Sequence, residues 1–549
     1  MKTADLSRDT RSAALDAMQH EQLDVLVVGG GIVGAGTALD AVTRGLRTAL
    51  VEAHDWASGT SSRSSKLIHG GLRYLEMFDF ALVREALRER GLLVNHLAPH
   101  LVRPVAFLYP LRHHGWERAY AGVGVALYDL MASAANGASG LPRHRHLSRA
   151  RALRLAPALR SDALTGAIQY YDAQVDDARY TMNVVRTAAS HGAFVANRTR
   201  VVSFERSGEY VIGARLLDLE TGREVVVHAK QVISATGVWT DKTQALAGLD
   251  GRALVRASKG IHLLVPRVRL DLGTGLILRT EKSVLFVIPW GAHWIIGTTD
   301  TDWAGDLNHP LVTNDDVAYL LSHVNEVLAD PLTPEDVEAV YAGLRPLLTG
   351  DSQSTAKLSR EHLVGHPAPG MVTVVGGKFT TYRVMAEDAV DEAVRDFSDP
   401  VPASRTVNVP LVGAEGWSAI WESRAVLAVD AQLSEELIEH LLRRYGTLTT
   451  QLLDLISKDR SLAEPLEVGS EYLRAEVIYA VSHEGALHLD DVLVRRTHLS
   501  IETADHGIGV APQAARLMAP LLGWSSDEIA RELARYGDLV DDESRPVVE

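Results

Sequence analysis

Short apolar runs separated by polar and glycine-rich stretches predict an alternation of strands and helices at the start of the chain. Residues 24–28 form a run rich in Val and Leu, which is typical of a buried strand, and glycines follow at once. Residues 35–44 have the apolar spacing of a helix, and residues 46–51 form a second buried strand. Because a helix joins the two strands, we expect a β-α-β unit with a right-handed crossover.

The rest of the chain divides into a mixed middle and a helical end. Further strand-like runs occupy residues 225–234, 261–266, 284–289 and 294–297. A strand at 371–375 runs into glycines and a helix near 381–394, which repeats the opening pattern and indicates that the first domain is resumed late in the chain. Beyond a shift of composition near 400–410 the periodicity is helical. One apolar helix face comprises Leu437, Ile438, Leu441 and Leu442, between the expected caps Ser434 and Gly446.

Composition narrows the class of protein. At roughly 100–200 residues per domain, the 549 residues predict about three domains. Hydrophobic residues make up 46% and charged residues 23% of the chain, which is the balance of a soluble globular protein. The chain has no cysteine, which excludes disulfides, thiolate metal sites and cysteine-ligated iron–sulfur clusters and fits a reducing cytoplasm. No other metal-ligand spacing is present, and we expect no metal site.

The charge balance and the two chain ends exclude further classes. The net charge of −15 argues against general nucleic-acid binding. Residues 1–22 are polar, lack the apolar core of a signal peptide, and are expected to form an arm. The uncharged stretch 25–39 is shorter than the ~18 residues that a membrane span needs. The acidic residues 538–549 are expected to form a frayed tail.

A glycine-rich turn after the first strand carries the first chemical signal. It fits the pattern G-x-G-x-x-G and comprises Gly29, Gly30, Gly31, Ile32 and Gly34. These glycines permit a tight turn, a close approach of the backbone to a pyrophosphate at the helix N-terminus, and contact between helix and strand. Glu52 ends the second strand, where it can accept hydrogen bonds from an adenosine ribose. NAD and FAD both use this motif.

Two later turns favour FAD over NAD. The strand at 225–234 ends in Ala235, Thr236 and Gly237, where the domain of a long cofactor is expected to return. The strand at 371–375 is followed by Gly376, Gly377 and Lys378, which places a second helix N-terminus in the same domain. The positive end of such a helix stabilises an anionic reduced flavin.

The sequence at this point resembles a known family. Segment 60–75, TSSRSSKLIHGGLRYL, closely resembles the segment after the first flavin motif in respiratory FAD-dependent glycerol-3-phosphate dehydrogenases. Further matching blocks are VDDAR (175–179), ATGVW (235–239), SKGIH (258–262), VIPW (287–290), IGTTD (296–300), GLRP (343–346) and GGKFTTYR (376–383). The similarity runs in register from residue 24 to residue 383 and continues more weakly around VRRT (494–497).

The resemblance implies an α/β fold. It has a Rossmann-like FAD-binding domain of the glucose-oxidase/D-amino-acid-oxidase-like type, a mixed-sheet substrate domain and an all-helical C-terminal domain. The expected boundaries are 1–22 for the arm, 23–75, 160–240 and 355–398 for the FAD domain, 76–159 and 241–354 for the substrate domain, and 399–549 for the helical domain.

The resemblance also implies a function. Members oxidise sn-glycerol 3-phosphate to dihydroxyacetone phosphate by hydride transfer from C2 to N5 of FAD, and pass electrons to a membrane quinone. Without an iron–sulfur relay, the quinone must approach the flavin or its near surroundings. We therefore expect a cytoplasmic enzyme attached to the inner leaflet of the cytoplasmic membrane, with a homodimer through the C-terminal helices as a further possibility.

Candidate substrate residues follow from the same resemblance. The residues implied to line the substrate site are Arg73, Tyr74, Arg345, Arg360 and Lys378, with His262 close by. Guanidinium groups suit a phosphomonoester because their donors match phosphate oxygens. An arginine is a poor base, so Arg345 is expected to polarise the C2 oxygen as it becomes anionic. His262, or Lys378 with a lowered pKa, is the better proton acceptor, and the choice between the two stays open.

Flavin contacts are expected from several short segments. Within segment 60–75, the residues expected to contact the flavin are Ser61, Ser62, Ser65, Lys66, Leu67 and His69. Val201, in an expected strand at 199–202, supplies backbone contacts to the adenine edge, and Thr380 joins Gly377 and Lys378 at the second turn. Whether the flavin is covalently attached through a histidine is not decided by the sequence.

A basic stretch interrupts the acidic chain. Between residues 100 and 160 there are nine arginines and two acids, interleaved with aromatic and aliphatic side chains. Basic side chains attract anionic lipid, and Trp and Tyr favour the headgroup region. We therefore expect residues 101–131 to form a membrane surface, with residues 143–160 continuing the basic face and Arg112 and Arg118 contributing to attachment.

Three alternative functions remain open at this level. The first is a soluble glycerol-3-phosphate oxidase that uses oxygen, which in this family commonly carries an insertion in the middle of the chain. The second, of a different class, is a flavin-binding redox sensor without turnover. The third is an NAD-linked dehydrogenase, for which the turn at 376–383 would be incidental. The identity of the quinone is also open.

Overall fold

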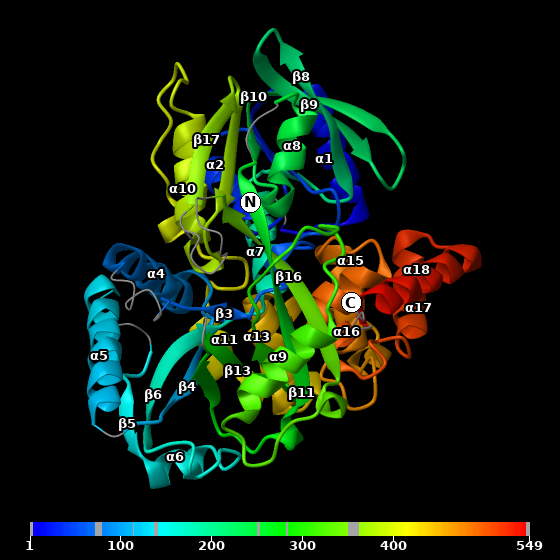
Figure 1. Ribbon diagram of the computed structural model, residues 1–549. Coiled ribbons are helices and arrows are strands. Elements are labelled where there is room, and N and C mark those ends of the chain that lie inside the picture. Colours follow the sequence, from blue (N-terminus) through cyan, green and yellow to red (C-terminus); the bar gives the residue numbers. More distant parts are fainter. Residues whose placement is uncertain are drawn as a thin grey trace.

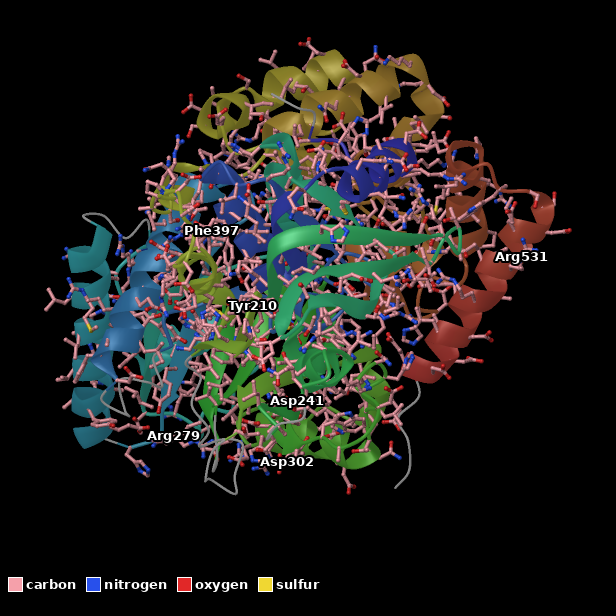
Figure 2. The ribbon with its side chains drawn as sticks, turned by 90° about the horizontal axis from the view of Figure 1, so that it is seen from above. Tyr210, Asp241, Arg279, Asp302, Phe397 and Arg531 are labelled. Atoms are coloured by element: carbon pink, nitrogen blue, oxygen red, sulfur yellow. The ribbon has the colours of Figure 1, made fainter. Side chains whose placement is uncertain are left out.

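Two sheets and a set of C-terminal helices make up the protein (Figure 1). The computed structural model describes residues 4–71, 79–113, 115–136, 141–249, 253–280, 284–349 and 362–544. The first sheet lies at the top of Figure 1, the second below it, and helices α15–α18 to the right. Seen from above, helices α4 and α5 lie on the flank opposite to α18, which carries Arg531 (Figure 2).

The strands fall into two sheets. The first contains β1 (Leu23–Val28), β2 (Thr48–Val51), β7 (Phe194–Ala196), β8 (Thr199–Ser207), β9 (Tyr210–Asp218), β10 (Glu224–Ser234), β17 (His362–Ala368) and β18 (Met371–Gly376). The second contains β3 (Leu67–Ile68), β4 (Arg103–Leu111), β5 (Arg145–Ser148), β6 (Gly166–Gln174), β11 (Val255–Pro266), β12 (Gly275–Arg279), β13 (Val284–Trp290), β14 (His293–Gly297), β15 (Thr301–Asp302) and β16 (Ala339–Leu348).

The α-helices lie on the sheets and at the C-terminal end. Before residue 400 they are α1 (Arg8–His20), α2 (Ile32–Thr43), α4 (Phe80–Leu92), α5 (Trp116–Asn136), α6 (Arg149–Leu155), α7 (Asp177–Ser190), α8 (Thr240–Leu246), α9 (Asn314–Asn325) and α10 (Tyr382–Ala393). After it they are α11 (Trp417–Glu422), α12 (Arg424–Ala431), α13 (Glu435–Tyr445), α14 (Thr449–Lys458), α15 (Arg474–His483), α16 (Leu499–Glu502), α17 (Ala511–Leu522) and α18 (Ser526–Ser544).

The first sheet confirms the predicted β-α-β unit and its late resumption. Its order is β17-β18-β10-β1-β2-β7, and β1 pairs in parallel with both β2 and β10. Strand β18 joins the sheet beside β10, so the segment near residue 371 does return to the first domain. Alternate strand residues face opposite sides: Val25 and Val27 pack with helices α2, α7 and α10, whereas Leu26 and Val28 pack on the other face.

The N-terminal residues do not form an extended arm. Helix α1 begins at a capping box of Ser7 and Thr10 and packs against β7 and β10. Ala14, Leu15 and Met18 are buried in the core on that face of the sheet. The prediction failed because the helical spacing of these three apolar positions is sparse in an otherwise polar segment.

The second sheet moves two of the expected domain boundaries. Its order is β15-β11-β14-β13-β12-β4-β6-β3, with β16 paired to β11 and β5 paired to β6. Strand β6, expected in the FAD domain, pairs along its length with β4 of this sheet, and β3 pairs with β6. An apolar run in the sequence contains no information on which sheet a strand joins.

The helical end is confirmed, but the expected frayed tail is wrong as far as Ser544. Ser434 caps α13 by accepting a hydrogen bond from the backbone N–H of Leu437, and Gly446 follows its last residue. Helix α18 continues to Ser544, and its Glu543 forms an ion pair with Arg63 of the segment after β2. The acidic end is thus held by a basic partner almost 500 residues earlier in the chain.

Candidate active site

A cavity of about 1030 Å³ is lined by residues of both sheets and contains most of the predicted site. The predicted residues that line it are Gly29, Gly31, Ile32, Glu52, Ser61, Ser65, Leu67, His69, Val201, Ala235, Thr236, Gly237, His262, Arg345, Gly377, Lys378 and Thr380. Gly30, Gly34, Ser62 and Lys66 are described but do not line it. Arg73, Tyr74 and Arg360 lie outside the described residues.

The first glycine turn brings the ends of the parallel strands together. Gly29 has φ +111°, and a Cβ there would lie 2.6 Å from the carbonyl oxygen of Ala235 at the end of β10. Only glycine combines this conformation with so close an approach. The turn therefore contacts the Ala-Thr-Gly segment directly, and both lie at the carboxyl edge of the sheet, where ligands of such folds bind.

Glu52 closes this turn from the other side. Its carboxylate accepts hydrogen bonds from the backbone N–H of Gly30 at 2.6 Å and of His54 at 2.8 Å. Burial raises the pKa of Glu52, and the two backbone N–H groups oppose that rise. Each oxygen retains acceptor capacity for the hydroxyls of a ribose.

The segment after β2 is held in place by contacts with helices α2 and α7. Ser61 accepts a hydrogen bond of 2.9 Å from the backbone N–H of Ile32 at the start of α2. The side chain of Lys66 turns away from the cavity: its ammonium is buried and lies 2.5 Å from Asp177. The side chain of Lys66 thus forms a buried ion pair, and the expected contact of this residue with a flavin stays a prediction.

The second glycine turn meets the same segment. Gly376 and Gly377 both have positive φ, and η7 (Phe379–Thr381) follows them. The hydroxyl of Thr380 lies 3.2 Å from the backbone nitrogen of His69 and 3.3 Å from its carbonyl oxygen. This contact joins two regions more than 300 residues apart.

Arg345 and His262 project from paired strands of the second sheet. The guanidinium of Arg345 donates to the carbonyl of Thr299 and the hydroxyl of Thr298, both at 3.1 Å, and lies 3.7 Å from Asp300. About a quarter of its side chain, 23%, is exposed. The ion pair with Asp300 holds the guanidinium in place at the cavity wall.

His262 is buried and held neutral. Burial lowers its pKa well below the ordinary value, with Arg345 and Lys66 adding to the effect. Its Nε2 lies 2.8 Å from the hydroxyl of Ser65, and its ring stacks on Tyr341 at 4.6 Å. Its buried Nδ1 has no hydrogen-bond partner among the described residues. A neutral imidazole at the cavity wall can accept a proton.

The charge of the cavity favours an anionic ligand. Among the described lining residues, six are Lys or Arg and three are Asp or Glu. The cationic residues are Arg63, Arg200, Lys242, Arg279, Arg345 and Lys378. An excess of cations in an enclosed site attracts phosphates.

Comparison with known proteins decides the family. A family model described as FAD dependent oxidoreductase matches residues 24–383, and one described as the C-terminal domain of alpha-glycerophosphate oxidase matches residues 404–529. Glycerol-3-phosphate dehydrogenase 2 of Mycobacterium tuberculosis is 53% identical over 96% of this chain and 89% of its own length. The chain belongs to the family of FAD-dependent glycerol-3-phosphate dehydrogenases.

More distant family members agree. The human mitochondrial glycerol-3-phosphate dehydrogenase is 38% identical over 94% of this chain and 73% of its own length. The crystal structure of glycerol-3-phosphate dehydrogenase from Bacillus halodurans in complex with FAD superposes with a TM-score of 0.81, at 28% identity, and covers 99% of both chains. The family's three-part architecture therefore extends over the whole of the described chain.

The residues present fit the family's FAD. The first turn has no room for a side chain at Gly29, Glu52 offers carboxylate oxygens at the end of β2, and the lining carries excess positive charge for a pyrophosphate. The second turn, at Gly377, lines the same cavity although it is more than 300 residues later in the sequence.

The C-terminal domain also braces this site, which sequence reasoning missed. Asp55 lies three residues after Glu52 and is fully buried. Its carboxylate accepts hydrogen bonds from both terminal nitrogens of Arg496, at 2.7 and 2.9 Å, and from Nε of Arg495 at 2.5 Å. Together the two guanidinium groups hold the pKa of Asp55 at about 2 despite burial. The VRRT block marked the two arginines but could not reveal their partner.

Replacement of Gly29 by alanine should abolish FAD binding, because the new Cβ would clash with the carbonyl of Ala235. Gly45→Ala is the matched control: Gly45 also has positive φ, at +92°, but nothing lies within 4 Å of its Cβ position. We expect purified Gly29→Ala to lack the 450 nm flavin band and Gly45→Ala to retain it, with a stability loss of about 1–3 kcal/mol. Equal flavin content in the two variants would show that the close approach is not required.

Proposed function

We propose that this protein oxidises sn-glycerol 3-phosphate at C2 to dihydroxyacetone phosphate with bound FAD. One observation carries the proposal: a guanidinium, Arg345, and a neutral imidazole, His262, lie on two paired strands and line the same cavity as the glycine turns. The family's named relatives supply the substrate class. The cationic lining suits both the cofactor's pyrophosphate and the substrate's phosphate.

The flavin contacts in this proposal come from both glycine turns. Gly29, Gly31 and Glu52, with Val201 and the segment at Ala235, would hold the adenosine and pyrophosphate parts. Ser61, Ser65 and His69, with Gly377 and Thr380, would lie along the rest of the cofactor. When bound, FAD supplies the hydride acceptor for C2 of the substrate.

The protein's own residues then manage charge and protons. Arg345 and Lys378 bind the phosphate and polarise the C2 oxygen. His262 accepts the hydroxyl proton at Nε2, the nitrogen that already contacts the Ser65 hydroxyl. The lowered pKa of His262 keeps the imidazole neutral at neutral pH, which leaves one ring nitrogen without a proton, so we favour His262 over Lys378 as the proton acceptor.

Anaerobic titration with glycerol 3-phosphate tests the proposed reaction. We expect the flavin band of the wild type to bleach, and Arg345→Ala to retain flavin but bleach at least ~100-fold more slowly, because one charge-stabilising donor is lost. Glycerol without the phosphate serves as the control ligand. An unchanged spectrum in flavin-loaded wild type would favour the redox-sensor alternative, and loss of flavin from Arg345→Ala would make that residue structural.

We propose a membrane quinone as the electron acceptor. The cavity lining includes a group of aromatic and aliphatic residues, Tyr109, Tyr170, Ile277, Val284 and Phe286. Strands β4 and β6 carry the two tyrosines, and α5 packs against β6, so this group belongs to the part of the molecule that includes the proposed membrane surface. The oxidase alternative has support in the name of the C-terminal family model.

The two acceptors can be separated in one preparation. With glycerol 3-phosphate in air, we expect a short-chain quinone to receive most of the electrons and hydrogen peroxide to remain a minor product. The measurement follows quinone absorbance and peroxide together, and a catalase-treated sample shows how much of the peroxide signal is genuine. If peroxide accounts for most of the electrons with quinone present, the protein is an oxidase.

We propose that α5 attaches the protein to the inner leaflet of the cytoplasmic membrane. Within the described residues, no helix is long and apolar enough to cross a bilayer. One face of α5 nevertheless exposes Tyr120, Val123 and Leu130, of which Val123 is 70% exposed. The pair of His144 with Asp129 ties this helix to the segment that carries the exposed Arg143 and Arg145. An apolar face beside basic side chains suits an anionic lipid surface.

The structure changes which residues should be tested for attachment. Arg112 is paired with Glu326, and Arg118 donates to the carbonyl of Leu147, so each of these side chains already has a partner within the protein. Attachment then depends on the apolar face of α5. Dimerisation through the C-terminal helices stays a prediction.

Val123→Glu combined with Leu130→Glu should weaken attachment, because charges replace the apolar contacts. We expect co-sedimentation with phosphatidylglycerol-containing vesicles to fall ~10-fold or more, with dye-linked activity retained. Val426→Glu with Val429→Glu is the matched control, since both valines are exposed but lie on α12. Equal loss in both double variants, or no loss in either, would place the membrane surface elsewhere.

A further inference from the structure

Tyr128 lies on the opposite side of α5 from the exposed apolar residues. Its side chain is 1% exposed and packs with Val83 and Leu87 of α4. Three hydrogen-bond partners surround its hydroxyl: it accepts from the backbone N–H of Gly70 at 2.8 Å and from Arg90 at 3.1 Å, and it donates to Asp172 at 2.8 Å. One donor and two acceptor positions exhaust the capacity of a phenol oxygen.

The bond to Gly70 reaches the wall of the flavin cavity. Gly70 lies between His69 and Gly71, both of which line the cavity. A Cβ on Gly70 would lie 2.6 Å from the Tyr128 oxygen, so the turn and the phenol are in close contact. His69 is held from its other side by the hydroxyl of Thr380. The turn therefore lies between the second flavin turn and helix α5.

The remaining partners make this contact rigid. Asp172, on β6, lines the cavity and forms an ion pair with Arg90 of α4. Burial, together with Asp172, raises the pKa of Tyr128 well above its usual range, so the hydroxyl remains a donor at any physiological pH. All four groups are buried, and a buried network of this kind has one favourable arrangement.

We propose that Tyr128 is a positioning residue that couples the placement of α5 to the cavity-wall turn at His69–Gly71. A shift of α5 moves the phenol, and the bond to Gly70 carries that movement to the turn. The coupling to membrane attachment rests on the surface proposed above, whereas the positioning of the turn does not. Because such coupling is reciprocal, substrate binding at the cavity also changes the affinity of α5 for a bilayer.

Tyr128→Phe in the full-length, flavin-loaded protein tests the proposal. The ring stays and only the hydroxyl is lost. We expect flavin content to be retained and kcat/KM for glycerol 3-phosphate with a soluble dye to fall ~10-fold or more, through misplacement of the turn. The change of kcat/KM on adding phosphatidylglycerol-containing vesicles should also shrink, while sedimentation with those vesicles is unchanged. The visible circular dichroism of the bound flavin reports the altered wall independently of turnover.

Tyr445→Phe is the matched control. Tyr445, on α13, is equally buried, and its hydroxyl donates to Glu476 at 3.0 Å and receives Arg179 at 3.5 Å, but it does not line the cavity. The Tyr445→Phe variant should lower the melting temperature about as much as Tyr128→Phe does. Its kcat/KM should stay within twofold of the wild type, and its flavin spectrum should be unchanged. If Tyr128→Phe folds poorly, Gly70→Ala disturbs the same contact from the side of the turn, because the new Cβ would press on the Tyr128 oxygen as well as on the Leu87 side chain. The kcat/KM and the flavin dichroism should then change in the same direction as in Tyr128→Phe.

The outcomes are separable. Wild-type kcat/KM and flavin dichroism in Tyr128→Phe would overturn the positioning role, and an unchanged vesicle effect in that variant would overturn the coupling. If the wild type itself fails to sediment with vesicles, or shows no vesicle effect, the coupling is overturned and the membrane surface is misplaced. The dye-linked rate without vesicles still decides the positioning role in that case.

Discussion

A backbone contact too close for any side chain organises the site. Because Gly29 has no Cβ, the turn after β1 lies against the end of β10, and the carboxyl ends of β1, β2 and β10 open on one cavity. Glu52 then reaches back to the same turn through the N–H of Gly30. Every other part of the site is placed relative to this edge, so the segments from distant parts of the chain must converge there.

The chemistry depends on how the cavity distributes charge. Its described lining carries more cations than acids, which suits phosphate groups of both cofactor and substrate. Burial keeps His262 neutral, and two cations add to the effect: Arg345 of this lining and Lys66 outside it. One electrostatic environment thus binds an anion and preserves a proton acceptor, because positive charge stabilises the first and disfavours protonation of the second.

Buried charges connect the first sheet and its helices to the helical domain. Asp55 joins the adenosine side of the first sheet to Arg495 and Arg496 of the helical domain, and Arg179 joins α7 to Glu484. A buried charge without its partner is costly, so these pairs favour one docking of the helical domain over others. Tyr128 forms an uncharged counterpart on the opposite flank, between α5 and the turn at Gly70.

Local patterns along the chain were sufficient to predict several elements and the positions of the motifs. Periodicity identified β1, α2 and β2, and glycine spacing identified both turns, because strand period, helix period and backbone freedom are properties of short segments. Resemblance to a family located Arg345 and His262. The arm at residues 1–22 and the sheet of β6 were misplaced, since sparse apolar positions and a strand pattern do not specify what they pack against.

The partners of the buried polar side chains became visible only in the folded protein. Lys66 forms an ion pair with Asp177, and Glu543 forms one with Arg63. The hydroxyl of Tyr128 forms hydrogen bonds with Gly70 and Asp172. The partners in each contact are separated by tens to hundreds of residues. Whether a basic side chain binds a cofactor or a buried carboxylate depends on which groups the fold brings within a few ångströms of it. That distance is set by the packing of the two sheets and the helical domain, and no local pattern contains it.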